Sequence, residues 1–415
     1  MRSIALDAVA AVVVERTAHH PQHRDGPRVV ASGNYATPLE LLGAVDGALP
    51  TYRLHVLNAQ PGIPARDGVT HETAFVGPAM RRSPTLAYIP SRLSLLPGLL
   101  TSVLAPDIVV IHCSRPVGGK VSLGVEVNVL PAAIESARAR GGLVLAQLNP
   151  SMPYTYGDSE LDVDLIDYAI DCDVPLASPV ARDADATSSQ IGLHVAAMIA
   201  DGATLQLGIG AVPDSTLAGL LHRKGLRIWS EMIGDGVLRL EDAGALDHEA
   251  VIVASFMFGS ADLYEWADHN PRVRLVRTER SNDPGLISKQ PAMTSINSAL
   301  QVDLFAQANA SRLGSRIHSG FGGATDFLVG ALHSPGGQAF IALRSWHPKA
   351  QVSSIVPLLE EPATSFQPTA IVTEQGVAAI HGHSEREQAA ALIAHAAHPD
   401  VRDELADEAR YLGLA

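Results

Sequence analysis

A glycine turn between an apolar strand and a helix constrains the fold of this chain more than any other feature of its sequence. Leu205 to Leu207 is a short apolar run, and Gly208-Ile209-Gly210 follows where a buried strand must stop and the backbone must turn tightly. Pro213 suits the first position of a helix, and Gly225 supplies a left-handed stop for it. The pattern predicts a strand, a tight turn and a helix.

A second strand follows this helix and ends at a carboxylate. Arg227 to Ser230 leads into Glu231, and Gly234-Asp235-Gly236 then forces another turn, so we expect Glu231 at the carboxyl end of a strand. Open α/β sheets bind ligands at that edge. Glu231 could be an ordinary solvated residue, and the glycines could be an ordinary turn between a strand and a helix. Together, however, backbone N–H groups that stabilise an oxyanion and a carboxylate nucleophile indicate acyl transfer.

The motifs in this stretch resemble those of a known family. The chain contains GIGAVPD at residues 208–214 and SEMIGDGV at residues 230–237. This pairing resembles the acetyl-CoA hydrolase and 4-hydroxybutyrate CoA-transferase family, which belongs to the class I CoA-transferases. The resemblance implies two similar α/β domains of CoA-transferase type with mostly parallel sheets, and it implies that Glu231 is the catalytic residue.

Further segments occur in the family's order, and the resemblance covers the chain from about Val29 to Leu405. They include ADGAT at 200–204, SNDP at 281–284, SINS at 295–298, HSGFGG at 318–323, VTEQGVA at 372–378 and AHP at 397–399.

The resemblance also assigns site residues. It places the segment Ser319 to Gly323 at the CoA thioester, although the same glycines could form a plain turn. It places Asn282 beside the acyl-CoA near the catalytic Glu, although Asn before Asp-Pro is also a good turn former. The oxyanion would be held by N–H groups around Ile209, Gly322 and Gly323, and CoA would be bound by Gly208, Gly210, Ala211, Asn282, Ser319 and Gly320.

One segment departs from the family pattern. Ser345-Trp346-His347-Pro348 stands where Ser-Thr-Ala is expected, after an apolar strand from Ala339 to Leu343. If Trp346 and His347 face the acyl pocket, they narrow it and favour acetyl or propionyl over longer groups. The alternative is that Trp346 packs in an interdomain or subunit contact.

The length and composition indicate a two-domain globular enzyme. The chain has 415 residues, of which 47% are hydrophobic and 18% are charged. It has no run of about 18 uncharged apolar residues, so no membrane partner is expected. Cys113 and Cys172 lack metal or disulfide spacing, which favours core thiols and a cytoplasmic location. Asp7 interrupts the apolar opening segment, which we interpret as a helix rather than a signal peptide.

The net charge of −14 argues against nucleic-acid binding, because phosphate backbones require clustered Lys and Arg. Coenzyme A is also a polyanion. Its phosphates must therefore meet local cations or helix N-termini that the overall charge conceals.

The fold class is α/β. Arg28 to Ala31, Asp107 to His112 and Leu143 to Leu148 have the pattern of buried parallel strands. Gly33 and Pro38 stand 175 residues before Gly208 and Pro213, each pair within a strand-to-helix turn. This repeated spacing agrees with two similar domains, which we expect at residues 1–187 and 188–415, with the catalytic Glu in the second.

The expected function is CoA transfer between a short-chain acyl-CoA and a small carboxylate, through an acyl-glutamyl anhydride and a glutamyl-CoA thioester. No metal or other cofactor is expected, because coenzyme A is itself a substrate, and we expect a homodimer or higher homo-oligomer. An acetyl-CoA hydrolase that uses the same Glu is the nearest alternative. A dinucleotide-binding oxidoreductase is remote, because Pro213 occupies the place of the third glycine of G-x-G-x-x-G. A non-catalytic CoA sensor would not need Glu231.

Overall fold

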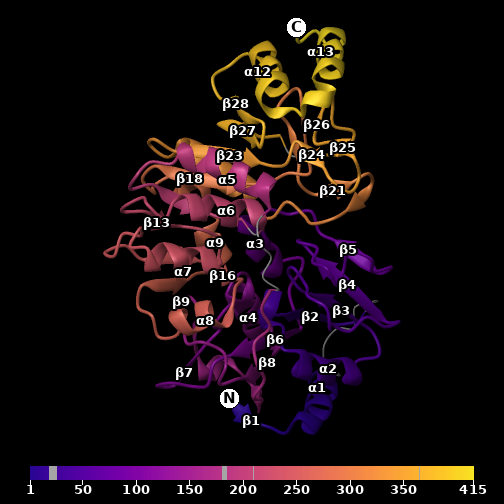
Figure 1. Ribbon diagram of the computed structural model, residues 1–415. Helices are drawn as coiled ribbons and strands as arrows, with labels where there is room; N and C mark the ends of the chain where they lie inside the picture. The colour runs from indigo at the N-terminus through magenta and orange to yellow at the C-terminus, as the bar shows by residue number, and fades with distance from the viewer. Residues whose placement is uncertain (18–25, 180–184, 209, 364) are drawn as a thin grey trace. The chain divides into compact units, whose positions relative to one another are not determined.

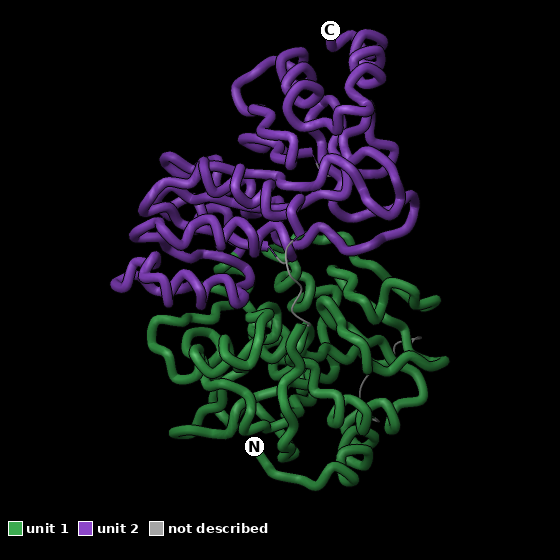
Figure 2. The backbone as a smooth tube through the Cα atoms, viewed as in Figure 1, with its two compact units in different colours: residues 1–179, 253–281 green, residues 180–252, 282–415 purple. Residues whose placement is uncertain are grey.

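The chain folds into two compact units. The computed structural model describes residues 1–17, 26–179, 185–208, 210–363 and 365–415. Contacts between residues assign 1–179 and 253–281 to unit 1, and 180–252 and 282–415 to unit 2 (Figure 2). The chain therefore enters unit 2, returns to unit 1 for residues 253–281, and finishes in unit 2.

Unit 1 is built on an eight-stranded sheet in which all neighbouring strands run parallel. Every residue of the central strands β6 (Ile108–Cys113) and β8 (Leu143–Leu148) is buried, as expected for a parallel sheet that is covered on both faces. In order across the sheet, the strands are β1 (Arg2–Ser3), β11 (Tyr168–Asp171), β8 (Leu143–Leu148), β6 (Ile108–Cys113), β2 (Arg28–Ala31), β3 (Tyr52–His55), β4 (Val69–Thr73) and β5 (Leu86–Tyr88).

Strand pairing also explains why segment 253–281 belongs to unit 1. Its strand β17 (Val273–Leu275) pairs in parallel with β9 (Tyr156–Gly157). The remaining strands of these segments are β7 (Lys120–Ser122), β10 (Glu160–Asp162), β15 (Ile252–Ala254) and β16 (Phe256–Met257). The helices are α1 (Val9–Thr17), α2 (Leu39–Ala48), α3 (Leu96–Leu100), α4 (Leu130–Ala139), α8 (Ala261–Ala267) and α9 (Thr278–Ser281).

Unit 2 contains a six-stranded sheet that is parallel except for its last strand, which is antiparallel to its neighbour (Figure 1). The strands in order are β13 (Arg227–Ile228), β12 (Thr204–Gln206), β18 (Met293–Asn297), β23 (Gln338–Ala342), β27 (Ala370–Thr373) and β28 (Gly376–Ala379). The shorter strands are β14 (Met232–Ile233), β19 (Gln301–Asp303), β20 (Ala308–Asn309), β21 (Arg312–Leu313), β22 (Arg316–Ile317), β24 (Trp346–His347), β25 (Val352–Ser353) and β26 (Ile355–Val356).

Helices complete the core of unit 2. Helix α5 (Ala186–Ala197) packs against α6 (Ala211–Gly219), and α11 (Ala324–His333) packs against β18 and β23. Phe327 of α11 and Ile341 of β23 belong to one buried apolar cluster. The other helices are α7 (Asp235–Asp242), α10 (Pro284–Ile287), α12 (Glu385–Ala391) and α13 (Arg402–Tyr411).

Each unit has a topological switch point at its first strand-helix-strand segment. In unit 2 the chain passes from β12 through α6 to β13 on one side, and β18 then pairs on the other side of β12. In unit 1 it passes from β2 through α2 to β3, and β6 later pairs on the other side of β2. Gly33 and Gly208 follow the equivalent strands, so the repeated Gly-to-Pro spacing in the sequence reflects a shared topology. Ligands of α/β proteins bind at such points.

Two boundaries differ from those expected from the sequence. Helix α6 begins at Ala211, so Pro213 is its third residue, where the missing N–H would have no partner within the helix. The helix ends at Gly219, and Gly225 adopts its left-handed conformation (φ +68°) in the turn before β13. The expected domain boundary at residue 188 falls inside α5, whose N-cap is Asp185. The return of segment 253–281 to unit 1 adds a second crossing between the units.

The remaining sequence expectations for the fold concern the opening segment and the cysteines. The helix expected there is α1, although Arg2 and Ser3 before it form β1. Cys113 and Cys172 are buried and are not joined by a disulfide. No helix among the described residues is both long enough and apolar enough to cross a membrane.

Candidate active site

Cross-strand hydrogen bonds place Glu231 at the carboxyl edge of the unit 2 sheet. The backbone N–H of Leu207 donates to Oγ of Ser230 at 3.1 Å, and that hydroxyl lies 3.3 Å from the carbonyl oxygen of Leu207. Ser230 is fully buried. Because Ser230 ties the ends of β12 and β13 together, the next residue, Glu231, is held near the end of β12.

The carboxylate of Glu231 contacts an amide side chain, and both groups lie against a glycine. Nδ2 of Asn282 donates a 2.8 Å hydrogen bond to Oε2 of Glu231, and Asn282 is fully buried. A Cβ atom placed on Gly323 would lie 2.0 Å from the same Oε2 and 2.3 Å from Nδ2 of Asn282. Position 323 therefore has no space for a side chain while the carboxylate and the amide hold this geometry.

The carboxyl group of Glu231 has a strongly shifted pKa. Desolvation by burial raises the pKa to about 7, the negative charge of Asp326 adds to the rise, and the hydrogen bond from Asn282 opposes it. Near neutral pH the group therefore exists in both protonation states. An ionised carboxylate that is poorly hydrated is a better nucleophile than one in water, which suits covalent catalysis.

The glycine-rich segment 319–323 leads into helix α11. Gly322 has a left-handed backbone (φ +56°), and Gly323 is the N-cap residue of the helix. The N-terminus of a helix carries partial positive charge from unpaired N–H groups, so it stabilises an anion beside it. The hydroxyl of Ser319 donates to the backbone carbonyl of Ala310 at 2.9 Å, and this bond holds the start of the segment against Ala310.

A cavity of about 300 Å³ lies at the start of α6 in unit 2. Gly210 is the N-cap of this helix and has φ +122°, a conformation that residues with side chains rarely adopt. Arg344 and His347 line the same cavity. A helix N-terminus and an arginine at one cavity form a suitable environment for an anion. The other lining residues are Ser188, Ala211, Val212, Pro213, Ser298, Ala299, Leu300, Leu343 and Ser354.

Arg344 is already paired within this cavity region. Its Nη2 lies 2.5 Å from Oδ2 of Asp185 and donates to Oγ of Ser188 at 3.0 Å. Hydrogen bonding from Arg344 and from the backbone of Ser188 lowers the pKa of Asp185 to about 2. Because Asp185 is exposed, an incoming anion can compete with it for the guanidinium group at small cost.

Comparison with known proteins decides the family. Residues 259–409 match the family model described as the acetyl-CoA hydrolase/transferase C-terminal domain. The 4-hydroxybutyrate coenzyme A transferase of Clostridium kluyveri is 36% identical over 404 residues, which cover 92% of this chain and 93% of that protein. This chain belongs to the acetyl-CoA hydrolase/transferase family.

Solved structures agree with this membership. The 4-hydroxybutyrate CoA-transferase from Porphyromonas gingivalis superposes with a TM-score of 0.82 at 30% identity, covering 99% of this chain and 98% of that one. RipA from Yersinia pestis gives a TM-score of 0.88 at 26% identity, covering 99% and 100%. The chain is therefore an enzyme of the acetyl-CoA hydrolase/transferase family, and the oxidoreductase and sensor alternatives are set aside.

The structure brings together some of the residues that the resemblance to the acetyl-CoA hydrolase/transferase family assigned. Glu231, Asn282 and Gly323 lie in contact. Gly210 and Ala211 line the cavity at α6, and Gly320 lines a smaller cavity of about 30 Å³ that also contains Ser298. Gly208, Gly322 and Ser319 are in the turns beside these groups without lining either cavity. Ile209 lies outside the described residues.

The two unusual residues of segment 345–348, Trp346 and His347, have different surroundings in the structure. His347 lines the cavity at α6, whereas Trp346 does not and instead places its ring 5.0 Å from the ring of His398. This arrangement favours a packing role for Trp346. Sequence reasoning missed Arg344 and Ser298 as cavity residues, although the arginine stands directly after an apolar strand and so could have been found.

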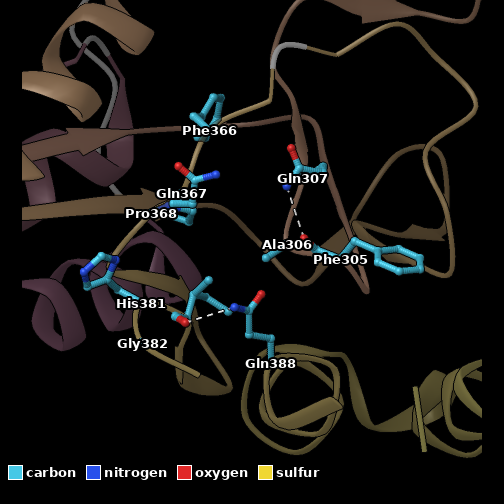
Figure 3. Close-up of a pocket in the computed structure, with 10 residues that line it drawn as sticks. Phe305, Ala306, Gln307, Phe366, Gln367, Pro368, His381, Gly382 and Gln388 are labelled. Atoms are coloured by element: carbon cyan, nitrogen blue, oxygen red, sulfur yellow. Dashed lines mark hydrogen bonds between the residues drawn. The ribbon is translucent and has the colours of Figure 1, made fainter. Parts of the chain in front are cut away.

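A further cavity of about 70 Å³ in unit 2 lies apart from the predicted site residues (Figure 3). Figure 3 shows the side chains of Gln307 and Gln388 at its edge, where they donate to the backbone carbonyls of Phe305 and Ile380 at 3.2 Å. None of the residues that line it belongs to the predicted site. Among the described residues, no group of three or more His, Cys, Asp or Glu side chains is placed to hold a metal ion.

Proposed function

We propose that the chain is a CoA-transferase that moves coenzyme A between a short-chain acyl-CoA and a small carboxylate, with Glu231 as the nucleophile. The observation that carries this proposal is the contact of the Glu231 carboxylate with the amide of Asn282, both lying against the backbone of Gly323. The chain's similarity to proteins named as 4-hydroxybutyrate CoA-transferases supports a small carboxylate of that class.

The reaction begins when an oxygen of the Glu231 carboxylate attacks the thioester carbonyl. The C–S bond breaks, the CoA thiolate leaves, and an acyl-glutamyl anhydride forms. N–H groups at Ile209, Gly322 and Gly323 hold the negative charge on the carbonyl oxygen in this step. The thiolate then attacks the glutamyl carbonyl of the anhydride, which frees the first acid and leaves a glutamyl-CoA thioester.

An acceptor carboxylate reverses these steps. It attacks the glutamyl thioester and forms a second anhydride with release of the thiolate. The thiolate next attacks the acyl carbon of the acceptor, which gives the new acyl-CoA and restores the Glu231 carboxylate. Both substrates react at one residue in turn, so the kinetics are ping-pong. No metal or additional cofactor takes part in this scheme.

The cavity at α6 is the proposed site for CoA. Its lining by Gly210, Ala211 and Arg344 offers N–H groups and a cation to the anionic part of the substrate, although the net charge of the chain is −14. Gly320, beside the smaller cavity, is proposed to contact the chain near the thioester, where Ser319 fixes the segment.

Hydrolysis is the second candidate, because water that reaches the anhydride or the glutamyl thioester would release both products. The deciding experiment incubates the enzyme with acetyl-CoA, with and without propionate or 4-hydroxybutyrate, and measures free CoA and new acyl-CoA. The transferase proposal predicts that the new acyl-CoA dominates when the acceptor is present. Release of free CoA at an equal rate in both mixtures would favour the hydrolase.

A further inference from the structure

The hairpin of β24 and β25 in unit 2 lies in a basic segment of an acidic chain. Residues 327–359 contain Arg344 and Lys349 but neither Asp nor Glu, although the net charge of the chain is −14. Strand β24 pairs antiparallel with β25, with His347 opposite Val352 (Figure 1). Arg344 and His347 both line the cavity at α6. The segment therefore brings a cation and an imidazole to the cavity that we assign to CoA.

Contacts before His347 fix the direction of its side chain. Ser345 is fully buried, and its backbone N–H donates to Oε2 of Glu374 at 3.0 Å. The ring of Trp346 lies 5.0 Å from the ring of His398. Because successive side chains of a strand point to opposite sides, the packing of Trp346 against His398 turns His347 to the other side, where it lines the cavity.

Nδ1 of His347 is bonded within the hairpin turn. It accepts a 3.0 Å hydrogen bond from the backbone N–H of Ala350, and the backbone carbonyl of His347 accepts another from Gln351 at 2.9 Å. A backbone N–H can only donate, so Nδ1 carries no proton and the N–H of the neutral ring is at Nε2. Nε2 has no partner among the described residues, and the side chain is exposed. This N–H is therefore available to a ligand in the cavity.

We propose that His347 donates its Nε2–H to a phosphate oxygen of coenzyme A in the cavity at α6. This inference rests on the proposed function, because it takes that cavity as the CoA site. Arg344 supplies charge there, whereas His347 supplies a single directed N–H whose orientation the bond from Ala350 fixes. His347 belongs to the segment that departs from the family pattern, so this donor is a feature of the present chain.

Two substitutions separate ligand binding from support of the turn. The amide of glutamine reaches the ε position, so His347→Gln places an N–H donor where Nε2 stands and loses the bond from Ala350. The amide of asparagine ends at the δ position, so His347→Asn keeps an acceptor oxygen for Ala350 and loses the donor to the ligand. The proposal predicts that Asn impairs binding and Gln preserves it. A role confined to the turn predicts the opposite ranking.

The test measures the Kd of CoA by isothermal titration calorimetry and the KM of acetyl-CoA. We expect His347→Asn to raise both about 10-fold with kcat unchanged, the order expected for one hydrogen bond to a charged group. His347→Gln should keep both within about 3-fold of wild type. Pantetheine and acetyl-pantetheine lack the phosphates, so their Kd and KM should be the same in all three proteins. A wild-type Kd for CoA in His347→Asn, or an equal loss with pantetheine, would overturn the inference.

Dephospho-CoA identifies the phosphate that His347 contacts, because it lacks only the 3′-phosphate. An effect of His347→Asn that persists with dephospho-CoA assigns the donor to the diphosphate, and an effect that disappears assigns it to the 3′-phosphate.

His333→Ala is the matched control for the loss of an exposed histidine. Nδ1 of His333 donates to the backbone carbonyl of Val329 at 2.8 Å within α11, and His333 does not line the cavity at α6. Its Kd for CoA should equal that of wild type. A rise as large as that of His347→Asn would refute a role specific to the cavity.

The proposed function is judged separately, because the Kd of CoA requires no turnover. Wild-type enzyme that binds CoA but neither transfers nor hydrolyses acyl-CoA would refute the function, and the ranking of Kd values would still decide the role of His347. Acyl transfer by the wild type, together with an unchanged Kd in His347→Asn, would refute only the role of His347.

Discussion

The side chain of Asn282 donates a 2.8 Å hydrogen bond to the carboxylate of Glu231, and this contact stabilises the ionised form of a group that burial otherwise keeps protonated. Removing the amide with Asn282→Ala should therefore raise the pKa of Glu231 above its value of about 7. The acidic limb of the profile of kcat/KM against pH, which reports the ionised nucleophile, should move to higher pH. A limb at the wild-type position in Asn282→Ala would show that this hydrogen bond does not set the pKa.

The raised pKa of Glu231 also predicts how stability depends on pH. Between the unfolded pKa of about 4.5 and the folded pKa of about 7, the unfolded chain releases this proton while the folded chain retains it. Rising pH in this window therefore favours the unfolded state, and the loss is complete above pH 7. Glu231→Gln has no carboxyl group to ionise at this position and so lacks this loss of stability. Its Tm should exceed that of wild type at pH 8, and the difference should nearly vanish at pH 4. Equal differences at the two pH values would contradict the assignment.

Gly323 should be intolerant of any side chain for a catalytic reason. A Cβ atom there would lie 2.0 Å from the Glu231 carboxylate, so Gly323→Ala must displace the nucleophile or the amide of Asn282. We expect kcat to fall by at least about 100-fold, since small displacements of reacting groups have effects of this size. Gly43→Ala is the control, because Gly43 lies in helix α2 with open space where a Cβ atom would be added. It should leave kcat unchanged, and Gly323→Ala with wild-type kcat would exclude the described geometry.

Arg344 should recognise the anionic part of CoA rather than the acyl group. Arg344→Gln removes the cation from the cavity at α6, and we expect the KM for acetyl-CoA to rise about 10-fold, the order of one charge-assisted hydrogen bond. Acetyl-pantetheine, which lacks the phosphates, provides the comparison substrate. Its KM should be equal for both enzymes. A similar rise for both substrates would place Arg344 in a structural role, through its contacts with Asp185 and Ser188.

Sequence patterns predicted the elements that local chemistry dictates. The apolar runs of β2 and β8 were located at their observed bounds, and the shared Gly-to-Pro spacing correctly indicated two similar units. The limits of α6 were wrong by two residues at the start and by more at the end, because Pro213 and Gly225 tolerate several positions near a helix terminus. The return of residues 253–281 to unit 1 depends on pairing between distant strands, which no local pattern encodes.

Part of the candidate site could be predicted from the sequence. The motifs identified Glu231, Asn282 and Gly323 through the family order, and the structure shows that these three lie in contact. The raised pKa of Glu231 could not be predicted, because it depends on burial and on Asp326, which lies almost a hundred positions away.

Covalent attachment of CoA to Glu231 is the central claim of this account. Mass spectrometry of protease digests, made after brief incubation with acetyl-CoA and acid quenching, tests it most directly. The prediction is that the peptide containing Glu231 gains the mass of CoA joined with loss of water, and that Glu231→Gln shows no such peptide. Turnover by the wild type without this adduct, or CoA attached to a different residue, would contradict the assignment of Glu231 as the nucleophile.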